Sequence, residues 1–125
     1  MKKAVGTSEN SLQLPIFTNK NKAVKLIEIA WLEADSNYTT FHFANGEKVM
    51  VSRTMKEYMG ILSDKLFVRT HKSFAVNLRH IIRYDVKDEM IVMLHGGNRI
   101  AISRRKKKQF VATIQATFGR FWIPE

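Results

Sequence analysis

The chain has 125 residues, of which 45 % are hydrophobic, and this fits a single domain with a core of its own. Its 21 Lys and Arg residues against 11 Asp and Glu give a net charge of +10, which is typical of a nucleic-acid binder, although anionic membranes and acidic proteins attract such a charge too. The absence of cysteine excludes disulfides and thiolate metal sites. No run approaches the roughly 18 apolar residues of a membrane span, so we expect a soluble, cytoplasmic protein.

Residues 1–11 are small, polar and aperiodic, and they predict a disordered leader before a domain at 12–118 and an aromatic C-terminal tail at 119–125. Short strands are expected at residues 12–17, 23–27, 29–33, 38–43 and 49–52. Pro15 would confine the first strand to an edge or a strand end, and residues 18–21 predict a turn. Asn45 and Gly46 predict a hairpin between the strands on either side, because both turn positions tolerate positive φ.

Two helices are expected among the remaining elements. Thr54 and Glu57 fit a capping box, in which each side chain satisfies a free backbone amide of the other, so a helix should begin at residue 54 and end at 63–65. The apolar face of this helix, expected in the core, comprises Met55, Tyr58, Met59 and Leu62. Strands at 81–86, 90–94 and 99–102 follow, with a hairpin turn at Gly96 and Gly97. A second helix should begin near Ser103, with a buried stripe of Phe110, Val111, Ile114 and Phe118.

Five consecutive cations, residues 104–108, stand where the last strand gives way to the second helix. A solvated helix face is the ordinary explanation of such a run. However, cations in the first turn oppose the helix dipole, by roughly 0.3–1 kcal/mol each where they are exposed. A phosphate bound at this end would turn this energetic cost into a gain, because the free backbone amides, the helix dipole and the cationic side chains would all attract it. The run therefore predicts an anion-binding site.

A second basic segment lies at residues 67–77, F-V-R-T-H-K-S-F-A-V-N, where polar residues interrupt an apolar run. Strict alternation would place Lys72 on the same face as Val68 and Phe74, where an unpaired ammonium is unfavourable. We therefore expect the strand to break at residues 71–73 and to expose a polar loop with Lys72 in solvent. His71 lies in the same loop, and both a structural and a functional role remain open for it.

Residues 33–38, E-A-D-S-N-Y, form the third candidate, and their D-S-N part is ordinary turn chemistry. The carboxylates of Glu33 and Asp35 invite a catalytic or metal-binding hypothesis, but no third carboxylate or histidine accompanies them at a fitting spacing. The chain also lacks a Gly-rich phosphate loop, H-E-x-x-H and G-x-S-x-G. We expect neither an enzyme nor a cofactor or metal site.

These three segments, in this order, resemble the motifs of the LytTR family of bacterial DNA-binding domains. Residues 29–38, I-A-W-L-E-A-D-S-N-Y, resemble I-x-Y-I-E-A-x-x-N-Y, with Trp31 where a tyrosine is common. Residues 67–77 resemble F-x-R-x-H-[RK]-S-[YF]-x-V-N, which is the most specific match. Residues 102–108 resemble the closing V-S-R-R-x-K. The resemblance spans roughly residues 13–115, nearly the whole chain.

The resemblance implies a mainly β fold, an elongated stack of small antiparallel sheets with one or two short helices, which reads DNA through loops in successive major grooves. Carried over by position, the base contacts would come from Asn37, Tyr38, His71, Lys72, Arg104 and Arg105. Lys72 and Arg104 lead this set, because Lys and Arg pair well with guanine O6 and N7. The phosphate contacts would come from Arg69, Ser73, Ser103, Lys106, Lys107 and Lys108. The motif residues with a structural role would be Glu33 and, in the core, Phe67, Phe74 and Val76.

The implied function is that of a stand-alone bacterial transcriptional regulator, which binds double-stranded DNA sequence-specifically with two protomers on paired direct repeats. The chain has no receiver domain, so its own phosphorylation is not the expected switch. One alternative is a basic β domain for RNA or single strands, with bases stacked on Phe17, Tyr38, Phe41 and Phe43. Another is an adaptor whose aromatic tail, residues 118–123, recruits a protein partner.

Overall fold

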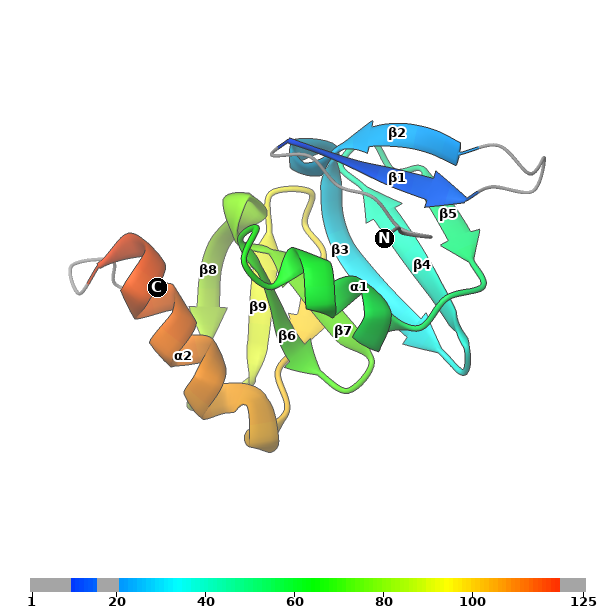
Figure 1. Cartoon of the computed structure of the whole chain (residues 1–125). Helices are drawn as coiled ribbons and strands as arrows, with labels where there is room; N and C mark the ends of the chain where they lie inside the picture. Colours follow the sequence, from blue (N-terminus) through cyan, green and yellow to red (C-terminus); the bar gives the residue numbers. More distant parts are fainter. Residues whose placement is uncertain (1–9, 16–20, 120–125) are drawn as a thin grey trace.

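The computed structural model describes residues 10–15 and 21–119, which form three antiparallel sheets and two helices (Figure 1). A two-stranded sheet pairs β1 (Ser11–Pro15) with β2 (Asn21–Lys25). A five-stranded sheet has the order β5-β4-β3-β7-β6 and consists of β3 (Ile29–Asp35), β4 (Tyr38–Phe43), β5 (Lys48–Val51), β6 (Phe67–His71) and β7 (Phe74–Asn77). A three-stranded sheet has the order β10-β9-β8 and consists of β8 (Ile81–Asp85), β9 (Ile91–Leu94) and β10 (Arg99–Ala101). The helices are α1 (Met55–Leu62) and α2 (Arg104–Phe118). The expected stack of small sheets is confirmed.

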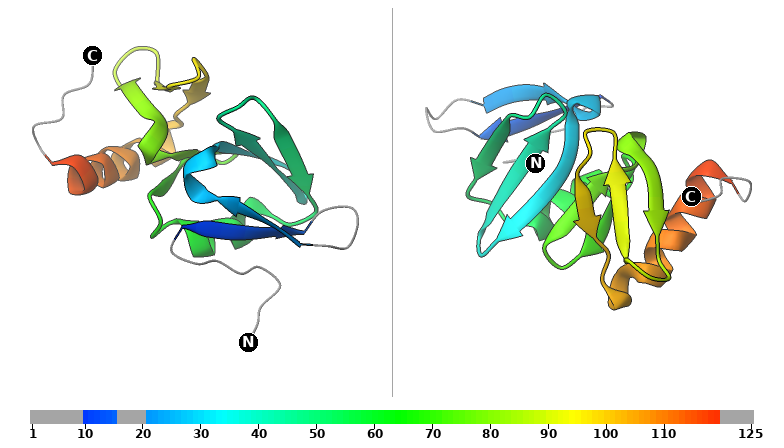
Figure 2. Two further views of the ribbon diagram at one scale, coloured as in Figure 1. Left: turned by 90° about the horizontal axis from the view of Figure 1, so that it is seen from above. Right: turned by 180° about the vertical axis from the view of Figure 1, so that it is seen from behind.

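The five-stranded sheet lies between two hydrophobic cores. The β1–β2 sheet and α1 pack on one face, and the three-stranded sheet and α2 pack on the other; the right-hand view of Figure 2 shows the three-stranded sheet from its own side. Because successive side chains of a strand point to opposite faces, Phe67 and Ala75 enter the first core, while their neighbours Val68 and Val76 enter the second. This double coverage explains why β6 and β7 are apolar at consecutive positions.

Helix α1 begins and packs largely as its sequence predicts. Thr54 is the N-cap, and its side chain accepts a hydrogen bond from the backbone amide of Glu57 at 3.2 Å. The Glu57 carboxylate lies 3.5 Å from Arg53 Nη1 instead of closing the expected capping box. Of the predicted face, Met59 is partly buried and the others are fully buried. Tyr58 is 0 % exposed, and this burial raises the pKa of its phenol to about 12.

Three expectations about the elements are wrong. The strand expected at 23–27 ends at Lys25, because residues 26–28 form a 3-10 turn, η1 (Leu26–Glu28), that redirects the chain from one sheet to the next and leaves Ile27 53 % exposed. Met90 has a φ of 54°, so β9 begins one residue later. Phe118 is 43 % exposed, because residues 115–119 extend past the core and the buried side chains of α2 are Phe110 and Ile114.

The ends of the expected units are only partly described. β1 already begins at Ser11, and Asn21, expected in a turn, is the first residue of β2. The rest of the expected leader, Phe17, the remainder of the turn at 18–21 and the tail after residue 119 lie outside the described residues. The hairpin at residues 45–46 is confirmed, with the positive φ of 92° at Gly46. Neither described helix is long and apolar enough to cross a membrane.

Candidate nucleic-acid interface

The three segments that the sequence singles out lie along one edge of the molecule, at the bottom of Figure 1. They are the β3–β4 turn, the β6–β7 turn and the start of α2. Two backbone hydrogen bonds of 2.8 Å tie them together: Ala34 donates to the carbonyl of Ser73, and Ser103 donates to the carbonyl of Thr70. Because these bonds belong to the backbone, one rigid frame presents the side chains of all three segments: the two hairpin turns and the turn from Ser103 into α2, together called the three turns.

The β6–β7 turn is organised by Arg69 and His71. Nε of Arg69 donates to the carbonyl of His71 at 3.1 Å, and its Nη2 donates to the carbonyl of Lys72. Burial lowers the pKa of Arg69. The Nδ1 atom of His71 accepts from the backbone amide of Ser73 at 3.0 Å, so a neutral ring carries its proton on Nε2. The break expected at residues 71–73 is confirmed, and Lys72 is exposed as predicted.

The start of α2 brings its cations to the same edge. Ser103 is the N-cap, and its Oγ accepts from the backbone amide of Lys106 at 3.2 Å. No acidic residue lies in the first turn to balance the helix dipole. The cations divide between two sides of the helix. One side shares a depression with the β6–β7 turn, lined by Arg69, His71, Lys72, Ser103, Arg105 and Lys106. The other side carries Arg104, Lys107 and Lys108.

The β3–β4 turn presents Asn37 and Tyr38 to solvent, with Tyr38 47 % exposed. Behind it, the Glu33 carboxylate lies 3.0 Å from Nε2 of His42, whose ring stacks on Trp31 with 3.7 Å between centroids. Glu33 therefore belongs to a structural contact between β3 and β4. Within the described residues, no three or more His, Asp and Glu side chains gather in a way that could hold a metal ion.

Two features were not predicted from the sequence: one at the end of β7 far from this edge, and one at the edge itself. Asn77, which closes the second motif, is fully buried, and its Nδ2 donates to the carbonyls of Leu26 and Ile29 at 3.0 and 2.8 Å. The Asn77 side chain thus links the end of β7 to η1 and to the start of β3 by hydrogen bonds. Its polar character at the end of an apolar strand was the available signal.

The second feature is an acidic β8–β9 turn that lies next to the start of α2, to which it is joined by a 2.8 Å bond from the Ile102 amide to the Met90 carbonyl. Asp85 accepts there from the amides of Lys87 and Asp88, and these bonds lower its pKa. The run D-V-K-D-E at residues 85–89 was its signal in the sequence. Glu89 pairs there with Arg83 and Arg99, and the carboxylates of Asp85 and Asp88 disfavour a phosphate close to this turn.

The aromatic residues that would bind single strands are not displayed together. Phe41 is 0 % exposed and packs edge-on against Tyr58 with ring centroids 4.8 Å apart. Phe43 is partly buried against the first core, and Tyr38 alone of the described candidates is largely exposed. A stacking platform on the described part of the sheet is therefore not formed.

A mainly β domain with a basic edge fits the class of nucleic-acid-binding proteins. Residues 19–115 match the family model described as the LytTr DNA-binding domain, and the chain belongs to this family. The fold is also that of a solved structure from Bacillus cereus, described as the LytTr DNA-binding domain of a methyl-accepting/DNA response regulator. That structure has 20 % sequence identity and a TM-score of 0.71, over 84 % of this chain and 96 % of the other. No curated protein matches the chain in sequence. The chain is thus a DNA-binding domain, of a family whose role is binding and not catalysis.

Proposed function

We propose that the protein is a transcriptional regulator that binds double-stranded DNA sequence-specifically, by placing its three turns in successive major grooves on one side of the duplex. The observation that carries the proposal is the pair of backbone hydrogen bonds that hold the three turns in one line. A rigid line of turns suits the regular succession of grooves along a duplex, whose positions are fixed by the helical repeat.

The proposed roles follow from the chemistry of each side chain. The bases are read by Asn37, Tyr38, His71, Lys72, Arg104 and Arg105, since Asn suits adenine and Lys and Arg suit guanine. With Nδ1 occupied, His71 offers its Nε2–H as a donor to a base acceptor. The phosphates are held by Arg69, Ser73, Ser103, Lys106, Lys107 and Lys108. Arg69 has five N–H donors, so the two that hold the β6–β7 turn leave others for a phosphate.

Two protomers are proposed to bind side by side on paired direct repeats in the bacterial cytoplasm. Selection of bound duplexes from a randomised DNA pool, followed by binding across a salt series, tests this arrangement. We expect two short repeats about one helical turn apart. For the binding of one protomer, roughly five phosphate contacts give a slope of about −4 to −5 in log K against log salt. Steep salt dependence without any enriched sequence would refute sequence-specific recognition.

Arg104 and Lys107 form a matched pair for the proposed roles, because both are exposed on the same side of α2. Arg104→Ala should weaken binding to the selected site by roughly 1–3 kcal/mol and relax one base position. Lys107→Ala should weaken all duplexes alike and reduce the salt slope by about 0.9. If Arg104→Ala bound specific and random duplexes in the wild-type ratio, its role in base reading would be wrong.

A further inference from the structure

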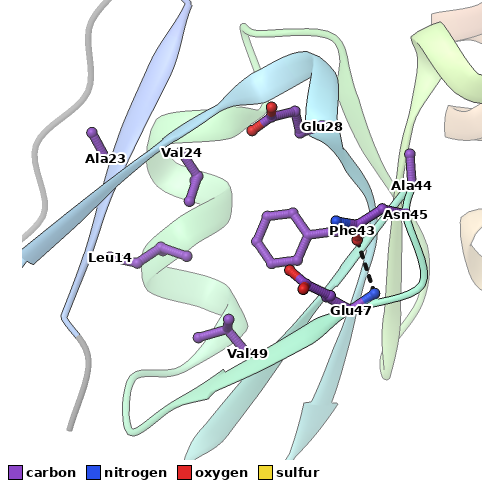
Figure 3. A pocket seen from close by; sticks show the side chains of 9 residues that line it. All are labelled: Leu14, Ala23, Val24, Glu28, Phe43, Ala44, Asn45, Glu47 and Val49. Carbon is purple, nitrogen blue, oxygen red and sulfur yellow. Dashed lines mark hydrogen bonds between the residues drawn. The ribbon is translucent and has the colours of Figure 1, made fainter.

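A second site lies away from the basic edge, in a pocket of about 340 Å³ between the β1–β2 sheet and the β4–β5 hairpin (Figure 3). The apolar part of its lining comes from Leu14, Val24, Phe43 and Val49. The size is at the lower end of the range of about 300–1,000 Å³ in which small-molecule sites occur. The pocket is therefore large enough for the body of a small organic molecule.

The lining also contains two carboxylates, Glu28 and Glu47, and in Figure 3 they lie on either side of the Phe43 ring. Their backbones are fixed, because the amide of Ala44 donates to the Glu28 carbonyl at 2.9 Å and the amide of Phe43 donates to the Glu47 carbonyl at 2.8 Å. The carboxylate of Glu28 accepts a 3.4 Å bond from the backbone amide of Lys25.

Neither carboxylate forms an ion pair with a Lys or Arg side chain of the described residues. Both glutamates are exposed, so their carboxylates together with the apolar wall suit a cation that carries a hydrophobic body.

We propose that this pocket binds a small organic cation, with an aromatic or aliphatic body against the apolar wall and an ammonium or guanidinium group between Glu28 and Glu47. The face of the Phe43 ring adds a cation–π contact at the same place. Binding of this kind would hold the β1–β2 sheet to the five-stranded sheet, because the lining residues come from both.

The pocket and the basic edge lie at opposite ends of β4. Asn37 precedes the first residue of the strand, Ala44 follows its last residue, and six residues of strand span about 20 Å. A ligand in the pocket therefore does not occupy the proposed DNA surface. The two sites can be tested separately, and the binding measurement below uses no DNA.

The test uses 4-phenylbutylamine as the probe, with 4-phenylbutanol and 4-phenylbutyrate as matched neutral and anionic compounds. Binding to the full chain is followed through the methyl resonances of Leu14, Val24 and Val49 in a titration to about 10 mM, which covers weak fragment affinities. We expect saturable shifts with the amine, weaker binding of the alcohol and the weakest binding of the carboxylate. No methyl shift with the amine, or equal binding of amine and alcohol, would overturn the proposal.

The variants Glu28→Gln and Glu47→Gln test whether the charge of each carboxylate contributes to binding of the amine. Each should weaken binding of the amine by about twofold to fivefold, since ion pairs at exposed positions are weak, and should leave binding of the alcohol unchanged. Glu57→Gln is the control, because Glu57 is an exposed acid on α1 that does not line the pocket. Equal loss in the control, or unchanged amine binding in both pocket variants, would show that the two acids do not form the site.

Discussion

The N-cap of α2 gives the sharpest test of how the basic edge is built. In Ser103→Ala, the 3.2 Å hydrogen bond from the amide of Lys106 loses its acceptor. Removing an N-cap hydroxyl lowers the free energy of unfolding by about 1 kcal/mol. The first turn has cations and no acid, so nothing else offsets the dipole there. DNA then has to order this turn at the same energetic cost, and the variant also lacks the proposed phosphate contact of Ser103, so the affinity for the selected duplex should fall by at least about fivefold.

Thr54→Ala is the matched control, because Thr54 caps α1 through a bond of the same length, 3.2 Å, to the amide of Glu57. Both variants should lose about 1 kcal/mol in urea unfolding, but Ser103→Ala alone should weaken DNA binding in a fluorescence-anisotropy titration. Two results would refute the reasoning: wild-type DNA affinity in Ser103→Ala, or equal loss of affinity in both variants. The latter would attribute the effect to global stability.

Three further predictions concern Asn77, at the far end of β7, and two side chains of the edge, Arg69 and Asp85. Asn77→Ala should lower the free energy of unfolding by about 2 kcal/mol, because the carbonyls of Leu26 and Ile29 each lose a donor, and only the Leu26 carbonyl is known to keep another, the Ile29 amide. A loss below about 1 kcal/mol in urea unfolding would contradict the structural role of Asn77. Arg69→Lys keeps the charge but not the fork that binds two turn carbonyls, so affinity for the selected duplex should fall with an unchanged salt slope, and wild-type affinity would show that the turn does not need the fork. Asp85→Asn should be less stable than the wild type at neutral pH, because the lowered pKa of Asp85 means that its charged form is stabilised by folding. In thermal melts the stability difference between wild type and variant should shrink as the pH falls below about 4 and through the lowered pKa of Asp85. A stability difference that does not change with pH would contradict this role of the Asp85 charge.

Local structure was largely predictable because its signals involve residues only a few positions apart. The caps at Thr54 and Ser103 and the turn at Gly46 each depend on backbone groups within three or four residues. The break at residues 71–73 followed from a similar argument, since an ammonium at Lys72 could not enter the core. The boundaries of η1 and the exposure of Phe118 were missed, because where the chain must turn and where a core ends depend on distant elements.

The candidate site was predictable as a set of charged segments but not as a surface. The sequence identified the basic residues of the β6–β7 turn and of α2, yet the hydrogen bond between Ser103 and Thr70 joins residues 33 positions apart. The hydrogen bonds from Arg69 to the carbonyls of its own turn could not be predicted either, because the charge of a side chain does not tell whether it points toward the protein or toward solvent. The same holds for the acidic β8–β9 turn, which becomes part of the edge through Met90.

What the sequence by itself determined is the mainly β character, the positions of the turns and caps, the net positive charge and the membership of a DNA-binding family. These properties come from composition, from short-range backbone chemistry and from ordered motifs. Only the tertiary structure decided that consecutive residues of β6 and β7 serve two cores, that three turns share one edge, and that Glu28, Glu47 and Phe43 line one pocket. The physical reason is that strand pairing and packing bring together residues far apart in the chain, and a local pattern does not record which partners will meet.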